Sequence, residues 1–305
     1  MKNIMTKRAT TIYLTVIGIL LVVVLGWYIA SFLTVDPDPI IFDGQRALTD
    51  VRTQVAFGPR IPGTDGHAQI RAWMREELES AGWTVEVQQT EAMGHPIFNI
   101  IAKRGEQNPQ IILGAHYDTR IYADNDPDPA NHSKPGPGAN DGASGVAVLL
   151  EIARTLPEDS VPVWLVFLDA EDNGRIEGWD WILGSRAFVQ QLVFRPEAVV
   201  IVDMIGDTDL NIYLEINSDP KLRSEIWQAA ADAGHDDVFI PQENHAILDD
   251  HTPFLEAGIQ AVDIIDFDYP FYHTLQDTPD KVSVESLQAV GETLLYWLEG
   301  RKSQQ

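Results

Sequence analysis

Short apolar runs recur along this chain with helical patterns between them, and this alternation restricts the fold more than any other feature. The apolar runs cover residues 97–102, 110–115, 161–168, 198–202 and 259–265. The helical patterns cover residues 146–155, 186–192, 222–233 and 284–298. Such runs indicate buried parallel strands, and the alternation is typical of a sheet covered by helices on both faces. We therefore predict a three-layer α/β fold with a mostly parallel central sheet.

The same periodicity places the start of the domain. Residues 42–55 predict a first helix ahead of the core. Ile70, Met74 and Leu78 recur at helical spacing, and Gly82 provides the C-terminal stop before a strand that begins near residue 83. Two loops, 122–138 and 173–183, are long for a compact domain. Loops of that length usually carry function.

The first forty residues predict a membrane anchor. Residues 11–33 carry no charge and are rich in Ile, Leu and Val, which is long enough to cross a hydrocarbon core of about 30 Å. Basic residues precede this stretch and acidic ones follow it, so we expect a cytoplasmic N-terminus and an extracytoplasmic domain. A cleaved signal peptide is the alternative, but its apolar core would be shorter, and residues 28–32 form a poor cleavage site.

These boundaries divide the chain into five parts. We expect a cytoplasmic tail (1–10), a single-pass transmembrane anchor (11–33), a linker (34–41), a catalytic domain (42–300) and a C-terminal tail (301–305).

Composition excludes some partners and some ligands. The chain has 46 acidic and 21 basic residues, a net charge of −25, whereas binding to a nucleic acid backbone needs a basic surface. Nucleic acid is therefore not an expected partner. The chain contains no cysteine, so His, Asp and Glu must hold any metal.

Five segments place histidine or carboxylate side chains where an apolar run stops or a helix begins. They contain His116 and Asp118, Asn140 and Asp141, Asp169 with Glu171 and Asp172, Asp203, and finally His273. Ligands of open α/β sheets bind at the carboxyl ends of the strands. Any one of these residues alone has an ordinary structural explanation: Asp141 could cap a helix, and Asp203 could lie in a surface turn. Adjacent carboxylates repel unless a cation or a shared proton reconciles them, so the set indicates a metal site.

The order and spacing of these motifs resemble the zinc-dependent aminopeptidase family called M28, over residues 57–297. The sequence is more narrowly similar to the glutaminyl cyclase branch of that superfamily. The segments that carry this narrower similarity are Tyr122-Ala-Asp-Asn-Asp-Pro-Asp-Pro, Asp169-Ala-Glu-Asp, the insert before Gly184-Ser-Arg, Ile247-Leu-Asp-Asp-His-Thr-Pro-Phe-Leu and Tyr272-His-Thr.

The cyclase resemblance implies one zinc ion and a specific set of roles. Asp141, Asp172 and His273 would bind zinc, and Glu171 would be a proton shuttle with a raised pKa. Asp203 and Asp249 would form an acidic hydrogen-bonded network beside it. The substrate would be the N-terminal glutamine of a peptide, converted to pyroglutamate with loss of ammonia. The substrate pocket would draw on Trp179, Trp181, Tyr272, Asp250 and His251.

The wider resemblance implies a di-zinc aminopeptidase that releases N-terminal residues. Two zinc ions would share Asp141, with His116 and Asp203 on one ion and Asp172 and His273 on the other. Glu171 would then be the general base of hydrolysis. A non-catalytic, peptidase-like binding ectodomain is the third possibility. It is disfavoured because the chain retains every ligand of both enzymes.

Overall fold

The computed structural model describes Val22 and residues 41–105 and 107–302. The predicted cytoplasmic tail, nearly all of the predicted anchor and linker, and most of the C-terminal tail therefore lie outside the described residues. Among the residues that are described, no helix is both long enough and apolar enough to cross a membrane. Residues 1–39 and 40–305 separate into two units, and the sheet, the helices and the candidate site all belong to the second.

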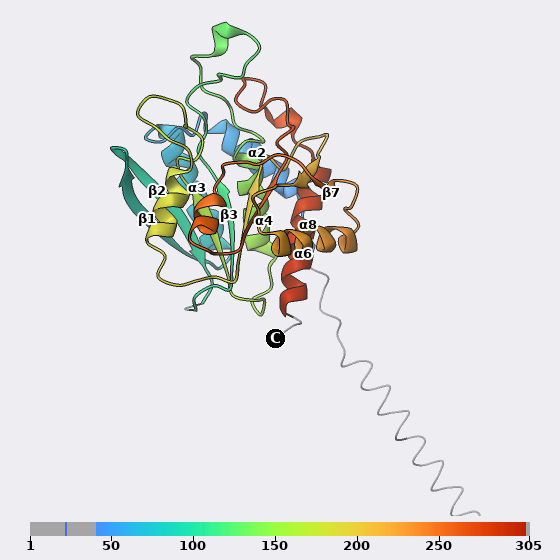
Figure 1. Ribbon diagram of the computed structural model, residues 1–305. Helices are drawn as coiled ribbons and strands as arrows, with labels where there is room; N and C mark the ends of the chain where they lie inside the picture. Colours follow the sequence, from blue (N-terminus) through green and yellow to red (C-terminus); the bar gives the residue numbers. More distant parts are fainter. Residues whose placement is uncertain (1–21, 23–40, 106, 303–305) are drawn as a thin grey trace, which may run out of the picture. The chain divides into compact units, whose positions relative to one another are not determined.

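A six-stranded sheet with the order β1-β2-β4-β3-β5-β8 forms the centre of the domain (Figure 1). Its strands are β1 (Thr84–Ala92), β2 (His95–Lys103), β3 (Ile111–His116), β4 (Val163–Leu168), β5 (Ala198–Asp203) and β8 (Ala261–Ile265). The strands β4, β3, β5 and β8 pair in parallel, whereas β2 is antiparallel to both of its neighbours.

The sheet is therefore mixed, and the expectation of a mostly parallel sheet needs this correction. Only Met93 and Gly94 separate β1 from β2, and both have positive φ, at 51° and 83°. Two consecutive residues of that kind form the tight turn of a β-hairpin, which forces the joined strands to be antiparallel. The parallel strands are joined by longer crossovers.

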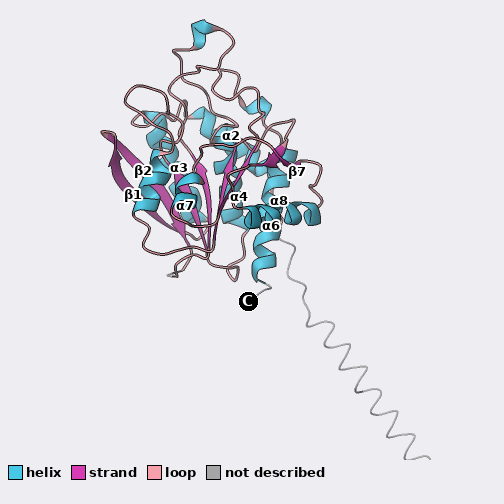
Figure 2. Ribbon diagram, viewed as in Figure 1, coloured by secondary structure: helices cyan, strands magenta, loops and turns pink. Residues whose placement is uncertain are grey.

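Helices cover both faces of the sheet (Figure 2). One face carries α2 (Gly44–Ala56), α3 (Asp65–Ser80), α4 (Ala143–Thr155), α6 (Pro220–Ala233) and α8 (Val284–Lys302). The other face carries α5 (Leu183–Gln190) and α7 (Thr252–Glu256), whose Phe188 and Phe254 pack on a smaller apolar cluster. The predicted α/β class is confirmed.

Some short elements were not predicted. They are α7, the strands β6 (Ile212–Leu214) and β7 (Phe239–Glu243), which form a separate parallel pair, and the single turns η1 (Pro129–Asn131) and η2 (Pro279–Lys281). Elements of three to five residues are too short to show a reliable period in the sequence. The loop after β7 contains Asp249, which lines the pocket described below.

Candidate metal centre and active site

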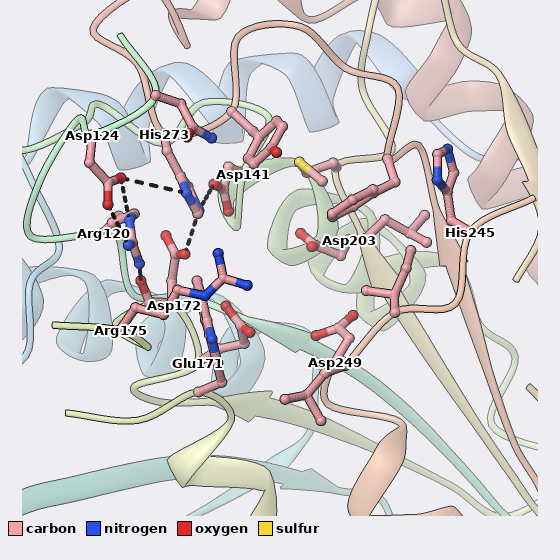
Figure 3. Close-up of a pocket in the computed structure, with 18 of the residues that line it drawn as sticks. Arg120, Asp124, Asp141, Glu171, Asp172, Arg175, Asp203, His245, Asp249 and His273 are labelled. Carbon is pink, nitrogen blue, oxygen red and sulfur yellow. Dashed lines mark hydrogen bonds and ion pairs between the residues drawn. The ribbon is translucent and has the colours of Figure 1, made fainter. Parts of the chain in front are cut away.

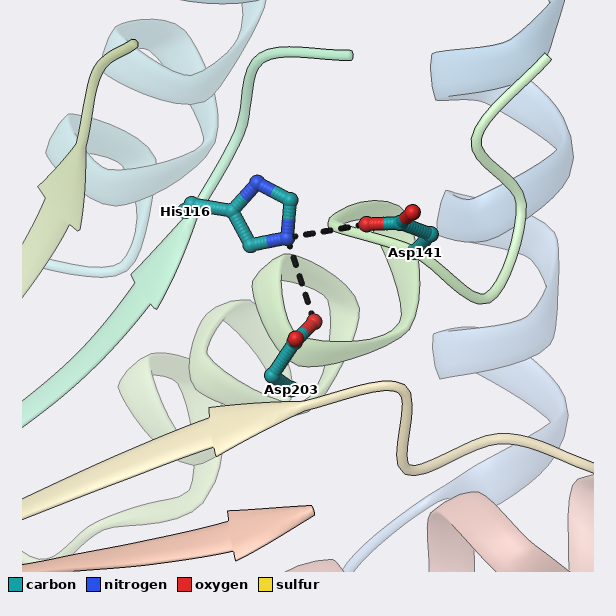
Figure 4. A group of neighbouring side chains, drawn as sticks. All are labelled: His116, Asp141 and Asp203. Atoms are coloured by element: carbon teal, nitrogen blue, oxygen red, sulfur yellow. Dashed lines mark hydrogen bonds and ion pairs between the residues drawn. The ribbon is translucent and has the colours of Figure 1, made fainter. Parts of the chain in front are cut away.

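Three side chains converge at the carboxyl edge of the parallel strands (Figure 4). His116 is the last residue of β3, Asp203 is the last residue of β5, and Asp141 lies in the turn before α4. The His116 Nε2 atom is 3.1 Å from Asp203 Oδ1 and 3.2 Å from Asp141 Oδ1. All three residues are buried. Asp203 is thus not a surface turn residue, and the N-cap position of α4 belongs to Gly142, with no side chain capping that helix.

A second group shares Asp141 (Figure 3). Asp172 follows β4, and His273 lies in the long loop after β8. The His273 Nε2 atom is 2.7 Å from Asp172 Oδ1 and 3.5 Å from Asp141 Oδ2. One oxygen of Asp141 therefore faces His116 and the other faces His273. This is the arrangement of a carboxylate that can bridge two cations. We refer to His116, Asp141 and Asp203 as the strand triad, and to Asp141, Asp172 and His273 as the pocket triad.

Both triads fit a zinc ion. The candidate donor atoms within each triad all lie within 4.8 Å of one another, and each triad offers one imidazole and two carboxylates. Zinc prefers three protein ligands of these types when it keeps an open position for chemistry. Asp172 Oδ2 is buried without a hydrogen-bond partner in the described structure, so it is available to a ligand that is not protein.

Each triad contains two buried carboxylates and only one imidazole, so positive charge is too scarce to balance the negative charge. Burial raises the pKa of Asp172 to about 6 and that of Asp203 to about 7, because a buried carboxylate is costly to ionise. Burial alone would lower the pKa of His273, but the carboxylate of Asp172 outweighs it and raises that pKa. A bound cation would relieve this repulsion between carboxylates.

Asp118 connects the two triads. Its carboxylate accepts hydrogen bonds from the backbone N–H groups of Glu171, at 3.0 Å, and Asp172, at 3.4 Å. Its Oδ1 atom is also 3.6 Å from Nδ1 of His116. This distance is too long for a hydrogen bond, and His116 Nδ1 has no hydrogen-bond partner in the described structure. Asp118 therefore fixes the backbone of Glu171 and Asp172 and places a negative charge near the His116 imidazole.

Two further buried residues hold the Asp141 turn, and sequence reasoning missed both. The Asp277 carboxylate accepts hydrogen bonds from the backbone N–H groups of Asn140, at 2.8 Å, and Asp141, at 3.2 Å. The Arg60 guanidinium donates to the carbonyls of Tyr117, Pro137 and Gly138, which ties the end of β3 to the end of the 122–138 loop. Neither residue lies at a strand end in the sequence, so no local pattern marks them.

Glu171 lies in the pocket beside the triads. It is buried, and burial followed by repulsion from Asp172 raises its pKa well above the usual range. Asp203 and Asp249 line the same pocket. A carboxyl group with a raised pKa can both accept and return a proton near neutral pH.

A third cluster of ionisable groups lies behind Asp249 and is fully enclosed. Asp249, His251 and Asp263 have side-chain atoms within 4.8 Å of one another. His251 lies 3.4 Å from Glu215 and 3.6 Å from Asp263. Burial, then the charge of Asp249, raises the pKa of Asp263 well above its usual range. Asp249 thus marks the boundary between the open pocket and this enclosed cluster.

The pocket has a volume of about 470 Å³. Trp181 and Tyr272 line it, and the Trp181 ring stacks on His273 with 6.1 Å between ring centres. The structure places the other three expected pocket residues elsewhere. Trp179 stacks on His95 at 3.6 Å and does not line the cavity, while Asp250 and His251 are buried behind it. Trp179 and Trp181 are two residues apart in an irregular loop, where no regular period assigns either side chain to the pocket, so sequence alone did not separate them.

Strained backbone is concentrated at this site. Among the described residues, four of the seven non-glycine positions with positive φ line the pocket, namely Arg175, Met204, His245 and His273. Such conformations cost about 1–3 kcal/mol each and persist where the surrounding structure enforces them, commonly at functional sites.

Residues 99–298 of the chain match peptidase family M28. The chain is 30% identical to Aminopeptidase YwaD of Bacillus subtilis over 215 residues, which are 64% of this chain and 42% of YwaD. Its structure is similar to the crystal structure of Porphyromonas gingivalis glutaminyl cyclase, with a TM-score of 0.81 and 35% sequence identity. The match covers 86% of this chain and 99% of that one. A Zn-dependent exopeptidase from Parabacteroides distasonis is 31% identical, with a TM-score of 0.77, covering 84% of this chain and 97% of that one.

The chain therefore belongs to peptidase family M28, as the motifs predicted. It is a zinc-dependent enzyme of that superfamily, and its relatives include both aminopeptidases and glutaminyl cyclases.

Proposed function

We propose that this enzyme is a glutaminyl-peptide cyclotransferase, which converts the N-terminal glutamine of peptides to pyroglutamate and releases ammonia. The observation that carries the proposal is the position of Asp249. It adds a carboxylate to the pocket that also holds Glu171 and Asp203, and its Oδ2 atom is buried without a hydrogen-bond partner in the described structure. An acidic surrounding of this kind keeps a neighbouring carboxyl group easy to protonate.

Cyclisation needs a proton carrier and no external nucleophile. The α-amine nitrogen forms a bond to the side-chain amide carbon, the bond from that carbon to the amide nitrogen breaks, and ammonia leaves. Glu171 accepts a proton from the attacking amine and donates one to the leaving nitrogen. A zinc ion held by Asp141, Asp172 and His273 would supply Lewis acidity at the amide carbonyl.

The walls of the pocket suit an internal attack. We expect Trp181 and Tyr272, which line the pocket, to confine a short side chain and so to hold the amine near the amide carbon. Orientation of this kind can lower the barrier by several kcal/mol, about 7–11 in the best intramolecular models. The correspondence with the Porphyromonas gingivalis glutaminyl cyclase, over 86% of this chain, supports the same choice.

A di-zinc aminopeptidase is the second candidate, and one specific observation favours it. The two oxygens of Asp141 face different histidines, which suits a carboxylate shared by two metal ions. In that enzyme Glu171 would deprotonate the attacking water, and the strand triad would be a full metal site.

Mass spectrometry and metal analysis together separate the two enzymes. Incubation with a Gln-initiated peptide should produce a loss of about 17 Da, the mass of ammonia, with the following peptide bond intact, as expected for a positioned internal nucleophile. The purified protein should contain one zinc ion per chain. Free leucine from a Leu-initiated peptide, two zinc ions per chain and no ammonia loss would identify the aminopeptidase instead.

We further propose that residues 11–33 anchor the enzyme with its catalytic domain outside the cytoplasm. The proposal rests on the uncharged stretch and its flanking charges. Protease added to intact cells should digest the domain and leave a short protected fragment. Digestion only after lysis would contradict this orientation.

A further inference from the structure

Arg175 lines the pocket but has no assigned role. It lies in the 173–183 segment that precedes α5, and its side chain is exposed. Figure 3 draws it among the residues around the cavity, on the same side as Glu171 and Asp172. Its backbone has a positive φ of 61°, a conformation that costs free energy for a residue with a side chain.

The other arginine of the pocket is fully engaged. Arg120 donates to the Asp124 carboxylate at 2.7 and 2.6 Å and to the carbonyl of Asp172 at 2.8 Å. In contrast, within residues 41–105 and 107–302 no side-chain hydrogen bond or ion pair of Arg175 is found. Its guanidinium is thus the uncommitted positive charge among the described residues that line the cavity.

The backbone that presents Arg175 is held in place. The Asn173 side chain accepts a hydrogen bond from the backbone N–H of Ile121 at 3.0 Å, and Arg120 donates to the carbonyl of Gly174 at 3.2 Å. Asp172 also forms a β-bridge with Trp181 across the base of the segment. The two residues directly before Arg175 are therefore fixed to the wall of the site, which limits where the guanidinium can reach.

The charge pattern of the pocket gives this guanidinium a specific use. Six carboxylates line the cavity: Asp124, Asp141, Glu171, Asp172, Asp203 and Asp249. They attract the positively charged end of a peptide, and the net charge of −25 repels acidic peptides. The free guanidinium of Arg175 would offset this repulsion for an acidic side chain that follows the first residue of the substrate. Guanidinium groups bind carboxylates through two parallel hydrogen bonds.

We propose that Arg175 determines specificity by binding an acidic side chain at the second or third position of the substrate. The inference rests on the proposed function only for the identity of the first residue, since either M28 activity would use the same pocket. It assigns the substrate class as peptides that begin with glutamine and carry aspartate or glutamate at the second or third position.

Two peptides of equal length test the proposal, one beginning Gln-Glu-Glu and one beginning Gln-Lys-Lys. The quantity to compare is the ratio of kcat/KM for the acidic peptide to that for the basic one, measured with the full-length protein. Arg175→Gln should lower this ratio about tenfold, as expected for loss of a charge-assisted hydrogen bond made by an exposed side chain. Arg175→Glu should lower it further, and 0.5 M salt should reduce the difference between wild type and variants.

Equilibrium affinity keeps the test independent of turnover. In a Glu171→Gln background, replacement of Arg175 should lower the ratio of the calorimetric affinity for the acidic peptide to that for the basic one, in the same direction as the kcat/KM ratio. Arg186→Gln is the matched control, because Arg186 pairs with Glu256 at 2.9 Å and does not line the cavity. It should leave the ratio as in wild type. Arg175→Lys, which keeps the charge, should retain part of the preference even if Arg175→Gln folds poorly.

The outcomes separate this inference from the proposed function. An affinity ratio that stays within twofold of wild type in Arg175→Gln and Arg175→Glu would overturn the role of Arg175, whatever the reaction. Absence of ammonia release by the wild-type enzyme would instead overturn the cyclase assignment. The affinity ratio would still test whether Arg175 binds acidic peptides.

Discussion

The strand triad and the pocket triad share Asp141 and have the same composition, but they are built differently. His116 and Asp203 are the last residues of neighbouring parallel strands, so the register of the sheet sets their separation. Asp172 and His273 come from loops, and His273 has a left-handed φ of 58°. The His116 side chain is 2% exposed and that of His273 is 11% exposed.

The contrast between the triads indicates which half of the site meets substrate. Asp172 and His273 line the pocket beside Glu171, whereas His116 does not line it. A ligand set made by loops can be reached from solvent and shaped for a substrate, whereas one made by strand ends is rigid and enclosed. Substitutions in the two triads should therefore have unequal effects on metal content and turnover.

The largest effect is expected at the pocket triad. His273→Ala removes an imidazole ligand that has no substitute nearby, so turnover should fall to background. Zinc affinity should fall by more than the roughly 10–100-fold typical of groups that only orient a ligand. Zinc titration and activity assays of the purified variant would check this. Full zinc occupancy with wild-type turnover would remove His273 from the ligand set.

A smaller effect is expected when the proton carrier alone is changed. Glu171→Gln keeps the shape of the side chain and leaves Asp172 in place, so the zinc content should be retained. Turnover should fall about 10²–10⁴-fold, the usual contribution of a positioned acid or base. The exposed Glu256→Gln provides a matched control with unchanged turnover. Loss of zinc from Glu171→Gln would show that Glu171 acts as a ligand or support.

The strand triad should respond more mildly if the cyclase proposal is correct. His116→Ala then removes a group that orients Asp141 and Asp203, so the protein should keep one zinc ion and part of its activity. In a di-zinc aminopeptidase the same change should empty one of two metal positions. The zinc-to-protein ratio of wild type and variant, measured together, decides between these outcomes.

The smallest effect concerns stability at a carboxylate outside both triads. Asp266 follows β8 and accepts hydrogen bonds from the backbone N–H groups of Asn211 and Asp268, at 3.0 and 3.1 Å. Burial raises the pKa of Asp266 to about 7 from an ordinary value of 3.8. The folded state therefore holds this proton more tightly than the unfolded state does.

The stabilisation from that proton is full below about pH 4 and is lost as the pH rises to about 7, with a slope of at most about 1.4 kcal/mol per pH unit. Asp266→Asn should lack this dependence. Urea unfolding of both proteins between pH 4 and 8, with a chelator present, would measure the difference. If the difference in the free energy of unfolding between wild type and Asp266→Asn stayed constant across that range, the prediction would be wrong.

Much of this protein could be determined from its sequence because the relevant signals are local. Five apolar runs marked β2, β3, β4, β5 and β8, and an alternating pattern marked β1. Polar residues near the ends of these runs marked the candidate site, since parallel strands end at one edge. The family resemblance singled out Asp141, Asp172 and His273 as candidate metal ligands, and the structure brings these three side chains together.

Only the tertiary structure decided the rest, because it depends on contacts between residues far apart in the chain. Asp277 holds the Asp141 turn from 136 residues away, and Arg60 binds Gly138 from 78 residues away. Whether Trp179 or Trp181 faces the pocket, and whether Arg120 or Arg175 keeps a free charge, depends on packing around the 173–183 segment. No periodicity records such contacts, since they arise from the closing of loops over the sheet edge rather than from the pattern of any one segment.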